Sequence, residues 1–434
     1  MLLNAADKAL WRLALPMIFS NITVPLLGLV DTAVIGHLDS PVYLGGVAVG
    51  ATATSFLFML LLFLRMSTTG LTAQAWGAKD PQRLVQPLAL ALGAGVLIIL
   101  LRLPLIDLAL HIVGGSEAVL EQARRFLEIR WLSAPASLAN LVLLGWLLGV
   151  QYARAPVILL VVGNLLNIVL DLWLVMGLRM NVQGAALATV TAEYATLIIG
   201  LLMAKRVLTL RGVSLAMLKN AWRGDLRRLL ALNRDIMLRS LLLQLCFGAL
   251  TVFGARLGSD IVAVNAVLMT MLTFTAYALD GFAYAVEAHS GQAYGARDGS
   301  QLLEVWRAAC RQSGMVALAF ALIYSLAGQY IIALLTSLPS LQQLADRYLI
   351  WQTILPVVGV WCYLLDGMFI GATRGAEMRN SMAVAAAGFA VTLLTLPVLG
   401  NHGLWLALAV FLALRGLSLA LIWRRHWRRG TWFS

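Results

Sequence analysis

The sequence places carboxylate and amide side chains inside long apolar stretches. Asp31 interrupts one such stretch, and another carries Asn164, Asn167 and Asp171 at spacings of i, i+3 and i+7. On a helix those three side chains share one face. An ionisable group inside a membrane is costly and is by default a functional candidate. These residues are therefore candidates to exchange protons or to bind a cation.

Two further polar residues, Thr189 and Glu193, lie four positions apart in the next apolar stretch. Carboxylates that converge in a low-dielectric bundle repel each other when ionised, so one of them can hold a proton near neutral pH. The same oxygens, with the amide and hydroxyl groups, could instead bind Na⁺. The alternative for each residue is a structural role, in which a polar side chain ties two helices together.

The second half of the chain carries its own ionisable residues in apolar stretches. Asp280 and Glu287 are seven positions apart on one helical face, and Asp366 follows in a later stretch. We predict that these three carboxylates line a substrate pathway. The alternative is an internal ion pair, and spacing does not decide which charges meet. Four arginines in apolar stretches are the candidate partners: Arg65, Arg239, Arg256 and Arg415.

The stretches that hold these residues predict an all-α membrane protein. Hydrophobic residues make up 61% of the 434 residues and charged residues only 12%, against about 25% charged residues in a soluble domain. About 20 apolar residues suffice for a helix to cross a bilayer. Twelve transmembrane helices are predicted, six per half: 10–36, 44–72, 84–108, 124–150, 156–178, 182–204, 229–257, 262–290, 306–335, 346–372, 380–400 and 403–423.

The chain also repeats itself at about half its length. The heptapeptide QAWGAKD begins at Gln74, and QAYGARD begins at Gln292, 218 positions later. A glycine pair recurs at a similar offset: Gly145 and Gly149, then Gly367 and Gly371. Such a repeat in a hydrophobic chain is typical of transporters built from two similar halves.

Two pseudo-symmetric six-helix bundles are therefore predicted. The N-terminal lobe is placed at 1–204, a basic cytoplasmic linker at 205–228 and the C-terminal lobe at 229–434. The carboxylates do not follow this symmetry, because the position that matches Asp31 in the second half falls near Leu250.

The net charge of +12 is interpreted as a membrane signal and not as a nucleic-acid signal. Most Lys and Arg residues fall in alternate loops, which is the positive-inside bias and predicts that both termini lie in the cytoplasm. The first apolar run is too long for a cleavable signal peptide. A multi-pass protein of the bacterial inner membrane is expected, with membrane lipids as partners and a monomer as the assembly.

Motifs for catalysis are not found. The sequence lacks a phosphate-binding glycine loop with its lysine, a zinc-type His-Glu spacing and a Gly-x-Ser-x-Gly elbow. The three cysteines have neither disulfide nor metal spacing. We therefore expect a protein that is not an enzyme, needs no cofactor and has no certain metal site. An ion gradient is then the expected energy source for transport.

Several segments resemble one transporter family. They are Leu29-Val30-Asp31-Thr32, the pair Asn167-x-x-x-Asp171, and the Gly-Ala ends of the second and eighth predicted helices. In these features the chain resembles the multidrug and toxic compound extrusion (MATE) family and, within it, the DinF-like (DNA-damage-inducible protein F) subfamily. The resemblance runs from about Lys8 to Trp432. It implies twelve helices in two lobes and cation-coupled efflux of toxic organic compounds.

The resemblance also implies roles for single residues. By that similarity Asp31 is the proton-switch aspartate of the first helix, with Asn167, Asp171 and Thr189 as its partners and Asn140 as a further candidate. Na⁺ could occupy the site at Asp31, Asn167, Asp171 and Thr189. Another subfamily carries an acidic residue for Na⁺ in its seventh helix, but residues 241–257 here hold no Asp or Glu. This departure favours a coupling site in the first lobe alone. H⁺ is the coupling ion we expect, with Na⁺ as the alternative.

The predicted mechanism is antiport by alternating access. Protonation of Asp31 from outside would rearrange its contacts, and the first helix, weakened at Pro25 as a hinge, would bend and expel an amphipathic, often cationic drug. Three alternatives are open: a passive channel, a membrane enzyme and a flippase for a lipid-linked precursor. A flippase would favour a basic cavity.

Overall fold

The computed structural model describes most of the chain, and the account below is confined to that part. The described residues are 7–21, 46–47, 49–50, 53–54, 57, 61, 63–77, 93, 95–113, 117–152, 154–210, 226–335 and 338–433. Every regular element within these ranges is helical. Asp31 and Pro25, the predicted switch and hinge, lie outside them.

Nine helical stretches in the described ranges are long and apolar enough to cross a membrane. They correspond to the fourth to twelfth predicted spans, and the first three predicted spans lie partly outside the described residues. The nine stretches are Glu117–Gly149, Arg154–Gly177, Asn181–Val207, Arg227–Gly254, Ala263–Gly295, Gly299–Leu334, Pro339–Gly371, Gly375–Leu399 and Asn401–Arg429. A multi-pass membrane protein is therefore confirmed.

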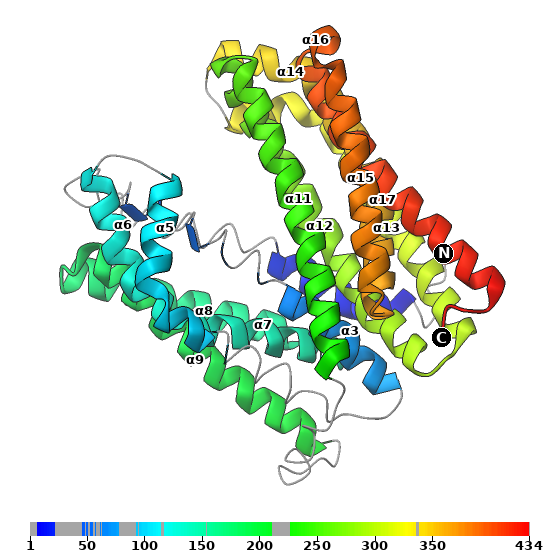
Figure 1. Ribbon diagram of the computed structural model, residues 1–434, viewed down its shortest axis with the longest axis horizontal. Coiled ribbons are helices and arrows are strands. Elements are labelled where there is room, and N and C mark those ends of the chain that lie inside the picture. The colour runs from blue at the N-terminus through cyan, green and yellow to red at the C-terminus, as the bar shows by residue number, and fades with distance from the viewer. Residues whose placement is uncertain are drawn as a thin grey trace. The chain divides into compact units, whose positions relative to one another are not determined.

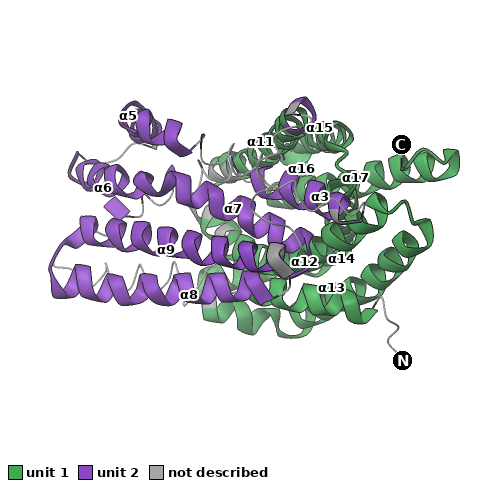
Figure 2. Ribbon diagram, turned by 90° about the horizontal axis from the view of Figure 1, so that it is seen from below, with its two compact units in different colours: residues 1–21, 230–434 green, residues 22–229 purple. Residues whose placement is uncertain are grey.

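The chain forms two compact units, coloured separately in Figure 2. Unit 2 comprises residues 22–229. In it α3 packs along α7, and α9 packs on α6, α7 and α8. Its helices are α3 (Phe63–Gly77), α5 (Arg102–Val113), α6 (Glu117–Arg130), η1 (Trp131–Ser133), α7 (Ala134–Gly149), α8 (Arg154–Asp171), η2 (Leu172–Gly177) and α9 (Asn181–Leu210).

Unit 1 comprises residues 1–21 and 230–434. In it α14 packs on α12, α13 and α17, and α15 packs on α17 (Figure 1). Besides a helix at residues 7–21, its elements are α11 (Leu226–Arg256, all but its first turn), α12 (Ser259–Gly295), α13 (Gly299–Leu335), α14 (Pro339–Gly371), α15 (Gly375–Thr392), η4 (Leu393–Thr395), α16 (Leu396–Leu399) and α17 (Asn401–Arg429).

Membership of the units differs from the predicted lobe boundary at the start of the chain. Residues 7–21 were expected in the N-terminal lobe but belong to unit 1. Asp7, which is buried, accepts two hydrogen bonds of 3.0 Å from Arg311 on α13. At the other end Asn21 donates to the Tyr277 carbonyl at 3.2 Å. These long-range contacts fix the segment to unit 1, and no local sequence pattern encodes them.

The repeated glycines mark two equivalent helix contacts, one in each unit. A Cβ on Gly145 of α7 would lie 2.6 Å from the Arg65 carbonyl oxygen of α3. A Cβ on Gly367 of α14 would lie 2.7 Å from the Ala283 carbonyl oxygen of α12. Real Cβ atoms do not approach so closely, so both helix pairs need glycine at the crossing. The predicted repeat therefore corresponds to a repeated backbone contact.

The turns that follow these helices are also equivalent. After α7 the chain turns at Gln151 (φ 64°), and after α14 it turns at Thr373 (φ 55°). In both turns the left-handed residue donates its N–H to the carbonyl three positions earlier, at 2.9 Å. The two turn residues are 222 positions apart, which aligns α8 with α15 and the later helices of each unit.

Candidate functional site

Helix α8 has one polar buried face, as its spacing predicts. Asn167 and Asp171 are only 3% and 2% exposed, whereas Leu165 and Val169 on the other side are 58% and 60% exposed. Asn164, three positions before Asn167, is half-buried. The exposed leucine and valine suit a lipid environment, and the amide and the carboxylate turn inward. The helix lies beside α9 (Figure 2).

The buried amide of Asn167 has spare capacity for a ligand. Its carbonyl oxygen Oδ1 accepts no hydrogen bond among the described residues. An oxygen of this kind costs free energy unless it finds a donor, a water molecule or a cation. With the Asp171 carboxylate one helical turn away, it provides the kind of oxygen ligands that bind a hard cation or a hydrated proton.

The helix changes from α to π directly after Asp171. The chain continues as the π-helical turn η2, in which Leu178 N–H donates to Trp173 O and Met180 N–H donates to Leu174 O, both at 2.9 Å. Such turns reorient the residues around them. The span predicted at 156–178 corresponds to one helical stretch, Arg154–Gly177, and no pattern in the sequence signals the π-helical turn at its end.

On α9 the two predicted residues have different surroundings. Thr189, half-buried, donates to the Ala185 carbonyl of its own helix at 3.2 Å, which leaves its oxygen lone pairs available. Glu193 pairs with Arg130 of α6 at 2.9 Å. Ser137 of α7 donates a short hydrogen bond to the same carboxylate.

Asn140 joins this cluster through the backbone. Its side-chain Nδ2 donates to the Glu193 carbonyl at 3.2 Å, so the structure brings these two predicted residues together. Glu193 thus ties α9 to α6 and α7, which is the structural role considered as its alternative. Arg130 was missed as its partner, although an arginine inside a predicted span is itself a signal.

Asp366 in unit 1 lies between two arginines. Its Oδ2 is 2.6 Å from Nη2 of Arg239 on α11 and forms a second, shorter ion pair with Arg415 on α17. All three side chains are buried, at 7%, 6% and 4% exposure. Among the four arginines considered as partners, these two meet the carboxylate. The alternative of an internal ion pair therefore describes Asp366 well.

The other two carboxylates predicted to line a substrate pathway lie on α12. Glu287 is 2% exposed, and its backbone carbonyl lies at the crossing with α14, where a Cβ on Gly371 would be 2.9 Å away. Asp280 is half-buried, two helical turns earlier.

Residues with metal-binding side chains are scattered. No group of three or more His, Cys, Asp and Glu side chains in the described ranges could hold a metal ion. Cys246, Cys310 and Cys362 are free thiols.

Comparisons with known proteins agree on one family. A family model described as MatE matches residues 16–173 and 236–399. The DNA damage-inducible protein F of Escherichia coli strain K12 is 87% identical to the chain over 436 aligned residues, with 100% of this chain and 95% of that protein covered. A probable multidrug resistance protein, NorM, of Acinetobacter baylyi is 23% identical, with 96% and 94% covered.

Solved structures show the same fold. A crystal structure of a MATE protein in complex with MaD3S superposes with a TM-score of 0.84 at 22% identity and covers 98% of this chain and 96% of that one. An outward-facing multidrug resistance transporter of the MATE family superposes with a TM-score of 0.81 at 24% identity, with the same coverage. The predicted fold class, the twelve-helix MATE fold, is confirmed.

Proposed function

Because the chain belongs to the multidrug and toxic compound extrusion family, we propose that it is a secondary active transporter that exports amphipathic, often cationic organic compounds in exchange for H⁺. Relatives that bear the names of multidrug resistance and multidrug export proteins support the substrate class. It would work in the bacterial inner membrane with both termini in the cytoplasm, as the basic loops suggest. No catalytic step is required.

The observation that carries the proposal is the polar face of α8. Asp171 and the unsatisfied oxygen of Asn167 are buried in a span that is otherwise apolar. A carboxylate there costs least when it is protonated or paired. A change in its surroundings can therefore move it between the charged and the neutral state, which is what a proton-coupled step demands.

Coupling requires that the proton and the drug favour opposite conformations, since a ligand shifts an equilibrium only by its differential affinity. In the proposed cycle the drug binds when Asp31 and Asp171 are ionised. Protonation from outside then removes the negative charge that attracts a cationic drug, and the drug is released. Asn167 and Thr189 would form hydrogen bonds with the ionised carboxylates in one state. In the next state they would form hydrogen bonds between α8 and α9.

The ion pairs of Asp366 argue against a cation site at this carboxylate of unit 1 and favour a coupling site in unit 2. Asp366 already has two guanidinium partners at close range. An incoming Na⁺ would have to displace a buried arginine, which would leave that charge uncompensated at a cost of several kcal/mol. The Asp366 carboxylate is thus poorly suited to bind a transported cation.

Everted membrane vesicles test the proposal. A lipophilic cationic dye should accumulate in vesicles that contain the wild-type protein when a pH gradient is imposed, and an Na⁺ gradient alone should not drive it. Asp171→Asn should abolish this accumulation. The matched control is Asp107→Asn, which removes an exposed carboxylate of the same unit and should transport normally.

Three results would contradict the proposal: dye accumulation driven by Na⁺ alone, full activity of Asp171→Asn, or no transport of any organic cation by the wild type. Movement of a lipid-linked diphosphate in the absence of drug transport would favour a flippase.

A further inference from the structure

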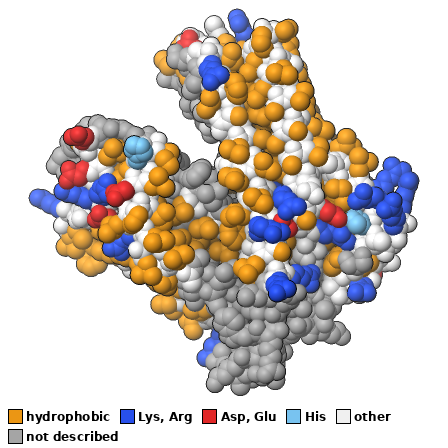
Figure 3. Space-filling view, in the orientation of Figure 1, with side chains coloured by type: hydrophobic (Ala, Val, Ile, Leu, Met, Phe, Trp, Pro, Cys, Tyr) orange, Lys and Arg blue, Asp and Glu red, His pale blue; other side chains and the backbone are white. Residues whose placement is uncertain are grey.

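The last two turns of α17 carry a dense group of arginines. Arg424, Arg425, Arg428 and Arg429 are all exposed, and their spacing of i, i+1, i+4 and i+5 places them along one side of the helix. Figure 3 shows a cluster of basic side chains over this end of the molecule, at the right of the view. We name these four residues the α17 arginine surface.

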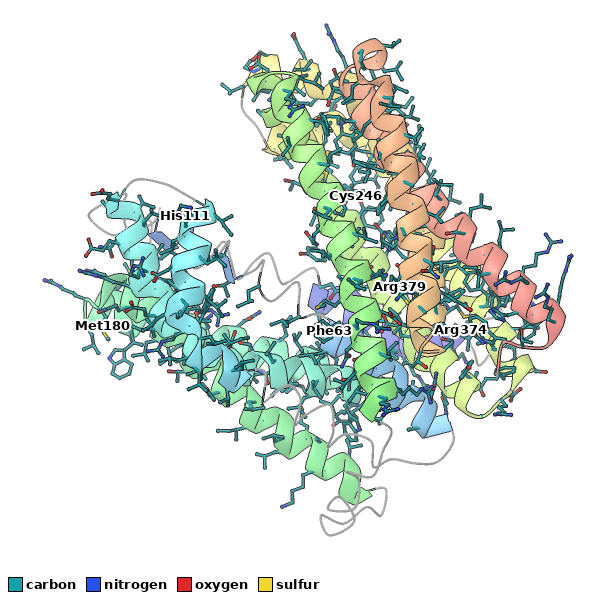
Figure 4. All side chains as sticks on the ribbon, in the orientation of Figure 1. Phe63, His111, Met180, Cys246, Arg374 and Arg379 are labelled. Carbon is teal, nitrogen blue, oxygen red and sulfur yellow. The ribbon has the colours of Figure 1, made fainter. Side chains whose placement is uncertain are left out.

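None of these four arginines forms an ion pair or a side-chain hydrogen bond with any residue that the structure describes. Other arginines near this end of unit 1 behave differently. Figure 4 labels two of them, Arg374 and Arg379, on the side of α15 where that helix begins. Each of these two has a carboxylate partner: Arg374 pairs with Glu377, and Arg379 pairs with Asp235. Elsewhere in unit 1, Arg311 pairs with Asp7. Positive charge on the α17 arginine surface is therefore available to a partner from outside the chain.

Aromatic side chains mark the level of the membrane surface next to these arginines. Trp423 stacks on Trp427 with ring centroids 5.7 Å apart, and Trp306 of α13 lies 5.7 Å from Trp423. Trp residues concentrate where the hydrocarbon core meets the headgroups. The candidate span of α17 runs from Asn401 to Arg429, so the four arginines occupy its last turns, where a spanning helix leaves the hydrocarbon core for the headgroups.

The C-terminal tail holds this helix end in place. Gly430 ends α17 in a left-handed conformation (φ 67°), and the chain folds back. Arg374 donates to the carbonyls of Thr431 and Trp432, at 3.0 and 2.7 Å. Trp432 is 1% exposed and packs edge-on against Phe369 with centroids 5.1 Å apart. The arginines therefore project from a fixed helix, which reduces the entropy that binding must overcome.

We propose that the α17 arginine surface binds the headgroups of anionic phospholipids in the leaflet at this end of α17. Guanidinium groups form paired hydrogen bonds with phosphate oxygens. An arginine near an anionic membrane surface strengthens binding about fivefold, and the contributions of several accumulate. A lipid is favoured over a nucleic acid or an acidic protein because the surface continues directly into a span and is flanked by tryptophans.

Native mass spectrometry of the full-length purified protein tests this surface. The protein is titrated in micelles that contain phosphatidylglycerol and phosphatidylethanolamine together, and retained molecules of each are counted. Replacing all four arginines by Gln should weaken phosphatidylglycerol binding at least tenfold, a lower bound because four contributions of about fivefold multiply to about 600-fold, and leave phosphatidylethanolamine unchanged. Replacing them by Lys should preserve most of the preference. The control replaces four exposed arginines elsewhere by Gln: Arg154, Arg179, Arg256 and Arg347.

The proposal is overturned if the Gln variant retains the wild-type preference, or if the control loses as much as the Gln variant. It is also overturned if the wild type captures RNA through these arginines and shows no preference between the two lipids. Thermal unfolding of each variant in detergent verifies that it is folded. Drug transport is measured separately, so the lipid result stands or falls independently of the proposed antiport.

Discussion

Helix α8 of unit 2 and helix α15 of unit 1 hold equivalent places in the repeat but differ in chemistry. Both have 18 residues, and both follow the same left-handed turn. With the turns aligned, Asn167 and Phe389 are equivalent, and each is 3% exposed. One unit buries an amide where the other buries a benzyl ring. The backbone repeat therefore does not require a polar group here, and the polar face of α8 is specific to unit 2.

The change of helix type after Asp171, in contrast to the polar face, is shared by the two units. In unit 1 the chain also leaves regular α-helix after Thr392, where the 3₁₀ turn η4 begins. By the 222-residue offset the two changes of helix type lie one residue apart, so a departure from regular α-helix near this point belongs to the shared architecture. What distinguishes unit 2 is that a carboxylate stands where the helix type changes.

Charge is distributed unequally at the glycine crossings as well. Asp366, next to Gly367, corresponds to Leu144 next to Gly145, and the paired carboxylate of unit 1 thus has an apolar counterpart in unit 2. The comparison teaches that each unit uses one scaffold for a different purpose. Unit 1 pairs its buried Asp366 with two arginines, and we propose that unit 2 uses its buried Asp171 for proton exchange.

The largest expected effect comes from giving α8 the character of α15. Asn167→Leu removes the unsatisfied oxygen beside Asp171 and should abolish gradient-driven drug accumulation in everted vesicles, while expression stays near normal. The matched control in unit 1, Phe389→Leu, places the same residue at the equivalent position, keeps that position apolar and should leave transport intact. Normal transport by Asn167→Leu would show that the polar face of α8 is structural.

Breaking the ion-pair cluster of unit 1 should destabilise the protein without removing its coupling. Asp366→Asn leaves Arg239 and Arg415 buried without their counter-charge, which costs about 3–5 kcal/mol. Thermal unfolding in detergent should therefore shift clearly downward, and transport by the folded fraction should still respond to a pH gradient. Unchanged thermal stability would show that the ion pairs of Asp366 do not stabilise the fold.

The glycine crossings should respond alike in the two units. Gly145→Ala and Gly367→Ala each place a Cβ against a backbone oxygen, so each should lower the free energy of unfolding by about 1–3 kcal/mol. Gly314→Ala, in open space on α13, is the control and should be neutral or slightly stabilising. A large loss of unfolding free energy for the variant of one unit alone would show that the two glycine crossings are not equivalent.

The smallest effect is expected at an exposed pair. Asp107 and Arg124 pair between α5 and α6 at 61% and 43% side-chain exposure. Asp107→Asn should change the free energy of unfolding by less than about 1 kcal/mol. A loss of several kcal/mol, measured in the same unfolding assay, would show that this pair has a larger role.

Much of this organisation could be predicted from the sequence because it is periodic. Hydrophobic length locates the spans, and the i, i+3, i+7 spacing identifies the buried face of α8. The glycine pairs identify the repeated crossings. Each of these patterns depends on residues within one helix or on a fixed repeat distance.

Contacts between distant segments could not be predicted. Arg239 and Arg415 are 127 and 49 positions from Asp366, and many other pairings satisfy the same composition. Glu193 was expected to face the coupling site, but its partner Arg130 lies 63 positions away on α6. Packing determines these choices, and packing has no local signature.

Substrate-induced proton release from purified protein tests the central claim, that exchangeable charge lies in unit 2, most directly. Addition of a cationic drug to lightly buffered wild-type protein should release protons in proportion to binding. Asp171→Asn should lose this release, and Asp366→Asn should retain it. Retention in Asp171→Asn together with loss in Asp366→Asn would contradict the account and assign the exchangeable proton to unit 1.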